Sequence, residues 1–326
     1  MNGELTMNKA VWAQTTNVGM GTEMTHRVFG KHTQEALRAV NGEAIRLESI
    51  LSHFKPESEI SRINRSAGIN CEELSLDTYE LLSCAAEFAS FSHGSFDVTV
   101  GPLVNLWDYK NSSEIPEEAS IRQILPLVNY VDLILDPSKK SAGLKQSGQS
   151  IDLGGIGKGF ASDKFLELFR DYGITSAFTN IGGNVAALGT KPDGSPWRVG
   201  IRHPRQSNRL LGAVLVADKA VVTSGDYQRY FVDRKGKRHH HILNPNTGYP
   251  AESGLISVTL VADSATVADA LSTIIFVAGM EKGLELLKGY PGTEVILVDS
   301  DLVVYATKGL KNCFHIDVGV RVNFIA

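Results

Sequence analysis

The stretch IDLGGIGKGF at residues 151–160 leads from an apolar run through four glycines into a segment with helical periodicity. Backbone amides at such a helix start can approach an anion closely, because glycine has no side chain to shield them. The spacing is not the GxGxxG of a Rossmann fold, and Lys158 is followed by Gly159 where a P-loop needs Ser or Thr. The stretch therefore excludes both common nucleotide folds. A phosphate-binding turn and a tight strand-to-helix turn both remain open.

Helical and strand patterns are interspersed along the rest of the chain. Apolar spacing predicts helices at 32–54, 78–91, 158–173, 265–278 and 281–287, and a loop rich in Glu, Ser and Pro is expected near 111–120. Short β-rich runs predict strands at 25–29, 131–135, 150–153, 178–181, 185–188, 197–201, 211–216, 227–232, 238–243, 256–261, 294–298 and 303–305. Because hairpins replace a regular strand-helix-strand repeat, the sequence predicts an α+β fold.

Composition narrows the class of protein. With 326 residues and 43% hydrophobic content, the chain can bury a sizeable core, and a net charge of −4 without a long basic run argues against binding nucleic acid. The first residues include no cationic region and no apolar stretch as long as that of a signal peptide, and no later apolar stretch is long enough to span a bilayer. The three cysteines, Cys71, Cys84 and Cys313, lack the CxxC spacing of a zinc site or a disulfide framework. We therefore expect a cytoplasmic protein without membrane insertion.

Within the predicted helix at 265–278, Asp269 and Thr273 lie four residues apart, on a face other than the apolar stripe. A carboxylate beside a hydroxyl is a poor zinc site but suits Mg²⁺ or Ca²⁺, because hard cations prefer oxygen ligands. The alternative is a solvated Asp269, with Thr273 bonded to its own helix.

Three consecutive histidines precede the turn NPNTGYP at 244–250. On a strand, His240 faces away from His239 and His241, so the three cannot converge on one metal ion. An imidazole titrates near neutrality and could accept a hydroxyl proton, and His241 is nearest the turn. The alternative is a structural histidine.

Two further segments are candidates for binding. The run SFDVTVGPL at 95–103 places an aromatic ring, a carboxylate and a hydroxyl before a Gly-Pro turn, which suits a planar ligand or an ordinary strand end. The run TSGDYQRY at 223–230 is a polar turn entering a strand, with alternate side chains on opposite faces.

These segments resemble the flavin transferases of the ApbE family, and the resemblance extends from Met20 to about Leu287. The matching blocks, in the order of that family, are MGT at 20, FKPESEISRIN at 54, SFDVTVGPLVNLW at 95, DLGGIGKGFASD at 152, NIGGN at 180, TSGDYQRYF at 223, HILNPNTGYP at 241 and SATVADALST at 264. The resemblance implies an ApbE-like α+β fold, with mixed or antiparallel sheets, flanking helices and an FAD cleft. It also implies an N-terminal extension at 1–18 and a single flavin transferase domain at 19–326.

The resemblance also implies an activity and a set of site residues. In the family, a magnesium-dependent reaction transfers the FMN moiety of FAD to a Thr or Ser hydroxyl of a target flavoprotein, forms a phosphoester and releases AMP. His241 matches the base, and Gly155 (through its carbonyl), Asp269 and Thr273 match the metal ligands, with Ser272 nearby. Positions that contact FAD are matched by Met20, Phe54, Ser95, Phe96, Asp97, Asp152, Lys158 and Ile242.

The chain departs from the common family form in three ways. It shows no lipoprotein leader, and it has Phe54 where Tyr is frequent and Asn244 where Asp is frequent. The first departure predicts a cytoplasmic acceptor, such as a soluble flavin-dependent reductase. Two other functions fit similar residues: a magnesium-dependent FAD pyrophosphatase that releases FMN and AMP, and a flavin-binding protein without catalysis.

Overall fold

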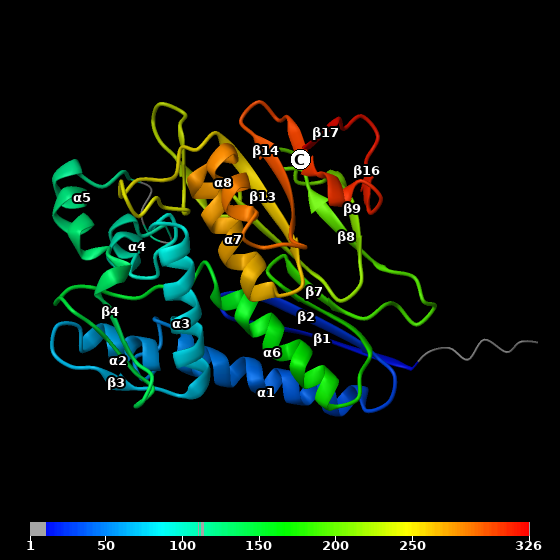
Figure 1. Cartoon of the computed structure of the whole chain (residues 1–326), viewed down its shortest axis with the longest axis horizontal. Coiled ribbons are helices and arrows are strands. Elements are labelled where there is room, and N and C mark those ends of the chain that lie inside the picture. Colours follow the sequence, from blue (N-terminus) through cyan, green and yellow to red (C-terminus); the bar gives the residue numbers. More distant parts are fainter. Residues whose placement is uncertain (1–10, 110, 112–113, 326) are drawn as a thin grey trace, which may run out of the picture.

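The structure is a computed structural model that describes residues 11–109, 111 and 114–325. Its centre is a nine-stranded sheet in which neighbouring strands are antiparallel, except for the last pair, which is parallel (Figure 1). In spatial order the strands are β1 (Trp12–Gly19), β2 (Thr22–Phe29), β6 (Ser176–Ile181), β7 (Asn184–Leu188), β10 (Ala220–Gly225), β13 (Leu255–Ala262), β14 (Glu294–Asp299), β15 (Val304–Thr307) and β17 (Val322–Ile325).

Helices cover one face of this sheet and a smaller sheet covers part of the other. The helical layer consists of α1 (Thr33–Leu51), α6 (Gly157–Asp171), α7 (Ala265–Ala278) and α8 (Met280–Leu287). The smaller sheet has the order β16 (Phe314–Ile316), β9 (Leu210–Val216) and β8 (Trp197–Arg202). Each layer buries its apolar residues against the central sheet, which explains the strand-like and helical hydrophobic patterns in the sequence.

Helix α7 is fixed to α6 at its first turn. The side chain of Ser264 accepts a hydrogen bond from the backbone N–H of Val267, a typical N-cap. Asp163 of α6 accepts hydrogen bonds from the backbone N–H groups of Ala265 and Thr266, at 2.8 and 2.9 Å. A carboxylate is favourable there, because it satisfies free N–H groups at the positive end of the helix. The two helices are therefore locked in register beside the site described below.

Most of the remaining elements form a group beside the helical layer. They are α2 (Glu59–Arg65), α3 (Leu76–Phe91), α4 (Gly101–Trp107), α5 (Glu118–Ile124), the short 3-10 helices η1 (Leu125–Leu127) and η2 (Tyr130–Asp132), the sheet β3 (Glu72–Glu73), β5 (Ser141–Leu144) and β4 (Leu133–Asp136), and the hairpin β11 (Tyr230–Val232) and β12 (Arg238–His240). A further 3-10 helix, η3 (Lys308–Leu310), connects β15 to β16 and packs with the smaller sheet.

The α+β prediction is confirmed, and the helix predicted at 265–278 has the same bounds as α7. The strand predicted at 150–153 is wrong, because Ser150 makes only an isolated bridge with Val100. The Gly-Pro turn predicted at 101–102 is also wrong. It is the start of α4, where proline fits because the first helical N–H needs no partner.

The predicted N-terminal extension needs a similar correction. Strand β1 pairs with β2 over its whole length, so residues 12–18 belong to the main sheet, while residues 1–10 lie outside the described part of the chain. The loop predicted near 111–120 likewise ends early, because α5 begins at Glu118. Among the described residues, no helix combines the length and apolar character needed to cross a bilayer.

Candidate active site

A cavity of about 1410 Å³ opens where the helical layer meets the ends of β2, β6, β7 and β10. Cavities that hold drug-sized ligands measure about 300–1,000 Å³, so this one has room for a dinucleotide. Every residue singled out from the sequence as catalytic, ligand-binding or metal-binding lines it: Met20, Phe54, Ser95, Phe96, Asp97, Asp152, Gly155, Lys158, His241, Ile242, Asp269 and Thr273. The structure thus brings together segments that are far apart in the chain, and their individual roles remain predictions.

Asp269 is held in the cavity wall by two hydrogen bonds. It is only 3% exposed, so the alternative of a solvated Asp269 is wrong, whereas Thr273 does donate to its own helix, to the backbone carbonyl of Asp269 at 3.5 Å. One carboxylate oxygen, Oδ2, accepts the backbone N–H of Gly159 at 2.8 Å, and Oδ1 accepts Nδ2 of Asn184 at 3.0 Å. A buried carboxylate needs such partners, and hydrogen bonds to a charged group are stronger than neutral ones.

The contact between α6 and α7 explains one glycine of the quoted stretch. A Cβ atom on Gly159 would lie 2.3 Å from the carbonyl oxygen of Ala265 and 2.8 Å from Cβ of Asp269. Any larger residue would push the helices apart, so glycine permits their close approach. The N–H of Gly159 donates to the side chain of Asp269. It therefore does not bond to the carbonyl of Gly155, four residues earlier in the chain.

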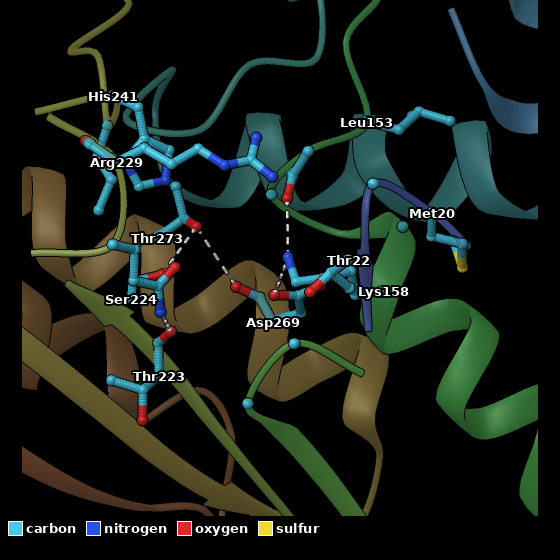
Figure 2. A pocket seen from close by; sticks show the side chains of 18 of the residues that line it. Met20, Thr22, Leu153, Lys158, Thr223, Ser224, Arg229, His241, Asp269 and Thr273 are labelled. Atoms are coloured by element: carbon cyan, nitrogen blue, oxygen red, sulfur yellow. Dashed lines mark hydrogen bonds and ion pairs between the residues drawn. The ribbon is translucent and has the colours of Figure 1, made fainter. Parts of the chain in front are cut away.

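Hydroxyl groups surround Asp269 (Figure 2). The Oγ atom of Ser224 in β10 lies 3.3 Å from Oγ1 of Thr273 and 2.8 Å from Oγ of Ser272. Gly155 lies against the same threonine, because a Cβ atom built on it would be 3.4 Å from Oγ1 of Thr273. The predicted metal ligands, Asp269, Thr273 and Gly155, are therefore neighbours. Ser272 bonds to Ser224 and to the backbone of Asp269 and does not line the cavity.

The donor set fits a hard cation that keeps other ligands. Among the described residues, no group of three or more His, Cys, Asp or Glu side chains is arranged to hold a metal ion. One carboxylate with neutral oxygens suits Mg²⁺, which commonly binds through one or two carboxylates together with water and phosphate oxygens. Nζ of Lys158 lies 3.8 Å from Oδ1 of Asp269 and donates to the carbonyl of Gly154 at 3.3 Å (Figure 2). Positive charge is thus already favoured beside this carboxylate.

His241 directly follows β12 and lies in the cavity wall beside Arg229 (Figure 2). Its Nδ1 lies 3.1 Å from the carbonyl oxygen of Arg229. A carbonyl can only accept, so Nδ1 carries the hydrogen and Nε2 keeps its lone pair. Burial, followed by the nearby charge of Arg229, lowers the pKa of His241 to about 3. The imidazole is therefore neutral at physiological pH and able to accept a proton, and an anionic ligand would raise its pKa.

The other two histidines are buried and do not line the cavity, although alternation alone would place His239 on the same side of the strand as His241. Nε2 of His240 lies 3.0 Å from the carbonyl oxygen of Ala251, and Nε2 of His239 lies 3.1 Å from Oδ2 of Asp233.

The residues predicted to contact FAD differ in what they offer a ligand. Phe54 is 66% exposed at the rim, where its ring can cover a planar group. Asp97 is only 6% exposed, and its two oxygens accept the backbone N–H groups of Thr99 and Tyr130, at 2.7 and 2.8 Å. Burial raises the pKa of Asp97. In this structure Asp97 joins the turn at 97–99 to the start of η2.

Several residues that build the site were not predicted from the sequence. Asn184 holds Asp269, Ser224 contacts Thr273, and the Arg229 carbonyl orients His241. The motifs NIGGN and TSGDYQRY contained these residues, but nothing in the sequence distinguished them from ordinary turn residues.

The site joins a glycine corner, the buried carboxylate of Asp269 beside neutral hydroxyls, and a histidine held by a backbone carbonyl. Such a set of groups suits an enzyme whose substrate carries phosphate groups.

Comparison with known proteins identifies the family. The family model described as the ApbE family matches residues 20–297. The FAD:protein FMN transferase of Klebsiella pneumoniae (strain 342) is 33% identical over 270 residues, 82% of this chain and 83% of that protein. The protein of the same name from Treponema pallidum (strain Nichols) is 33% identical over 310 residues, 89% of this chain and 85% of that one.

Solved structures agree with this assignment. The crystal structure of the ApbE protein from Thermotoga maritima superposes with a TM-score of 0.86 at 30% identity, covering 93% of this chain and 99% of that chain. The apo flavinyl transferase ApbE of Pseudomonas stutzeri gives a TM-score of 0.83 at 29% identity, with 96% and 100% covered. The chain belongs to the ApbE family.

Proposed function

We propose that this ApbE-family enzyme transfers the FMN moiety of FAD to a Thr or Ser hydroxyl of an acceptor flavoprotein, forming a phosphoester and releasing AMP. The observation that carries the proposal is the cavity in which Asp269, Thr273 and Gly155 adjoin one another and His241 lines the wall, with its Nδ1 held by the Arg229 carbonyl. The names of the relatives support the coarser statement that FMN passes from FAD to a protein.

The chemistry requires one bond to form and one to break. The acceptor oxygen attacks the phosphorus nearer riboflavin, and the bond from that phosphorus to the bridging oxygen breaks, so AMP leaves with the bridging oxygen. The neutral Nε2 of His241 takes the hydroxyl proton. Lys158 and the amides of the glycine corner hold the diphosphate in place.

The proposal includes Mg²⁺ bound by Asp269, Thr273 and the carbonyl of Gly155. When bound there, the ion would neutralise charge on the diphosphate and on the leaving phosphate. Phe54 at the rim would cover the isoalloxazine ring, a role that suits Phe as well as Tyr because either ring offers a flat apolar face.

Co-expression of this chain with candidate flavoproteins tests the proposal. We expect mass spectrometry to find FMN on a Thr or Ser of one candidate, and to find it absent when His241→Ala replaces the wild type. Incubation of FAD and Mg²⁺ without acceptor separates the alternatives. Fast release of free FMN would identify a pyrophosphatase instead, and FAD that stays bound and intact would identify a carrier.

A further inference from the structure

Strand β8 presents a free edge to the cavity. It is the last strand of its sheet and, among the described residues, pairs only with β9. Trp197, Arg198, Val199, Gly200 and Arg202 of this strand all line the cavity. A free edge carries unpaired backbone N–H and C=O groups, which can pair with an extended segment of another protein.

The floor beside this edge belongs to the central sheet. The ring of Trp197 in β8 packs edge-to-face on Phe178 of β6, with centroids 5.4 Å apart. Phe178, Asn180 and Thr25 of the neighbouring β2 line the same cavity. Because strand side chains alternate, Phe178 and Asn180 point away from the helical layer, toward which Ala177 faces. A groove therefore runs between the β8 edge and the open face of β2 and β6.

One end of the groove leads to the proposed base. Both guanidinium nitrogens of Arg205, three residues after β8 ends, donate to the two oxygens of Asp226 at 2.7 Å each. Asp226 begins the short segment that ends at Arg229, whose carbonyl holds His241. A chain lying along β8 would thus reach His241 beyond the Arg202 end.

The β8 edge carries unpaired positive charge on the face opposite Trp197. Arg198 and Arg202 are exposed and lie on the same face of β8, with Gly200 between them. Within the part of the chain that the structure describes, neither arginine has an ion-pair partner, while Arg229 adds a third positive charge to the cavity lining. Glu23 of β2 is the acidic residue of the facing strand that lines the cavity, so the two arginines outnumber the acidic side chains at this edge. Acidic side chains complement such an edge, and charge complementarity governs specificity and association rate.

We propose that an extended, acidic segment of the acceptor protein docks along the β8 edge, with its acidic side chains beside Arg198 and Arg202, and delivers its hydroxyl to His241. The inference rests on the proposed transferase function and names the surface that selects the acceptor. The proposal places FAD in the part of the cavity that Phe54, Lys158 and Asp269 line.

Two synthetic peptides serve as probes, and each contains a single threonine. Aspartates flank the threonine in the first peptide, and lysines flank it in the second. FMN attachment is followed by mass spectrometry with FAD and Mg²⁺ present. We expect kcat/KM for the aspartate peptide to be at least about tenfold higher than for the lysine peptide. The reason is that two exposed charge pairs, each worth up to about 1 kcal/mol, are attractive with the first peptide and repulsive with the second. The preference should shrink with added salt, because salt screens exposed charges.

The double variant Arg198→Glu/Arg202→Glu should reverse the preference and leave KM for FAD unchanged. Arg234→Glu is the matched control, because Arg234 is exposed in the hairpin loop between β11 and β12 and does not line the cavity. Hydrogen exchange supplies a second readout, since amides of β8 should exchange more slowly once the aspartate peptide is added.

Equal rates for the two peptides, an equal loss in Arg234→Glu, or unchanged exchange in β8 would overturn the docking surface. A raised KM for FAD in the double variant would also overturn it, because the adenosine part of FAD would then occupy the groove. If FAD is cleaved and the wild type labels neither peptide, the transferase proposal itself fails, and the docking inference falls with it.

Discussion

Replacement of Asp269 by asparagine separates the role that the structure shows for this residue from the role that we propose for it. The carboxylate accepts hydrogen bonds from Gly159 and Asn184, and it is the charged member of the proposed Mg²⁺ site. An asparagine has nearly the same shape, but its amide has one acceptor oxygen and a donor NH₂ where the second acceptor was. The variant therefore loses charge at the metal site and one hydrogen bond in the helix contact.

The expected magnitudes follow from these contacts. A hydrogen bond to a charged group contributes about 1.5–3 kcal/mol, so Asp269→Asn should lower the free energy of unfolding by about 1–3 kcal/mol. The melting temperature should then fall by a few degrees while the protein stays folded. Loss of a residue that supports a metal ligand weakens binding about 10–100-fold, so loss of the only charged ligand should weaken Mg²⁺ binding by at least about a hundredfold.

Asp163→Asn is the control, because Asp163 joins α6 to α7 through hydrogen bonds but does not line the cavity. Thermal denaturation and calorimetric titration of Mg²⁺ in the presence of FAD should show similar destabilisation in both variants, but weakened metal binding only in Asp269→Asn. Wild-type affinity for Mg²⁺ in Asp269→Asn would refute the assignment of the metal site.

Three further predictions test the surrounding structure. Gly159→Ala should lower the free energy of unfolding by about 1–3 kcal/mol and slow FMN transfer, because the new Cβ would lie 2.3 Å from a backbone oxygen. Gly42→Ala lies in an open part of α1 and should instead raise the free energy of unfolding by about 0.5–1 kcal/mol. Urea denaturation measures both changes. Burial lowers the pKa of His26 to about 4, so on acidification the unfolded chain binds a proton before the folded one does. The free energy of unfolding should therefore fall as the pH drops from about 6.5 to about 4. His26→Gln should remove up to about 3 kcal/mol of this pH dependence, and an unchanged dependence in the variant would contradict the prediction. Asp226→Asn should lower kcat with little change in KM for FAD, since the Arg205–Asp226 pair holds the segment that orients His241; a change confined to KM would argue against this positioning role.

Local patterns in the sequence predicted helix α7 well, because its start and its apolar spacing are local signals. Ser264 caps the helix and Gly279 ends it with a φ of 84°. The burial of Asp269 could not be predicted in this way, since it depends on Gly159, which lies 110 residues earlier in the chain. From the sequence, a polar residue outside the apolar stripe of a helix is expected to be exposed. Only the packing of a second helix shows that it is buried.

Other errors have similar causes. The run at 150–153 has an apolar strand pattern, yet it packs as an irregular segment, because Asp152 N bonds to the carbonyl of Val98 and Asn64 Nδ2 to the carbonyl of Ile151. Strand β1 was not predicted, because apolar and polar residues do not alternate along its sequence, WAQTTNVG. The role of the Arg229 carbonyl was equally hidden, since a backbone group has no sequence signature.

The most direct test of the central claim is the stoichiometry of products in a reaction of purified chain, FAD, Mg²⁺ and an acceptor protein. The account predicts that AMP and protein-bound FMN form in equal amounts, and that both are lost when His241 is replaced by alanine. AMP formed together with free FMN, at a rate that the acceptor does not change, would contradict it.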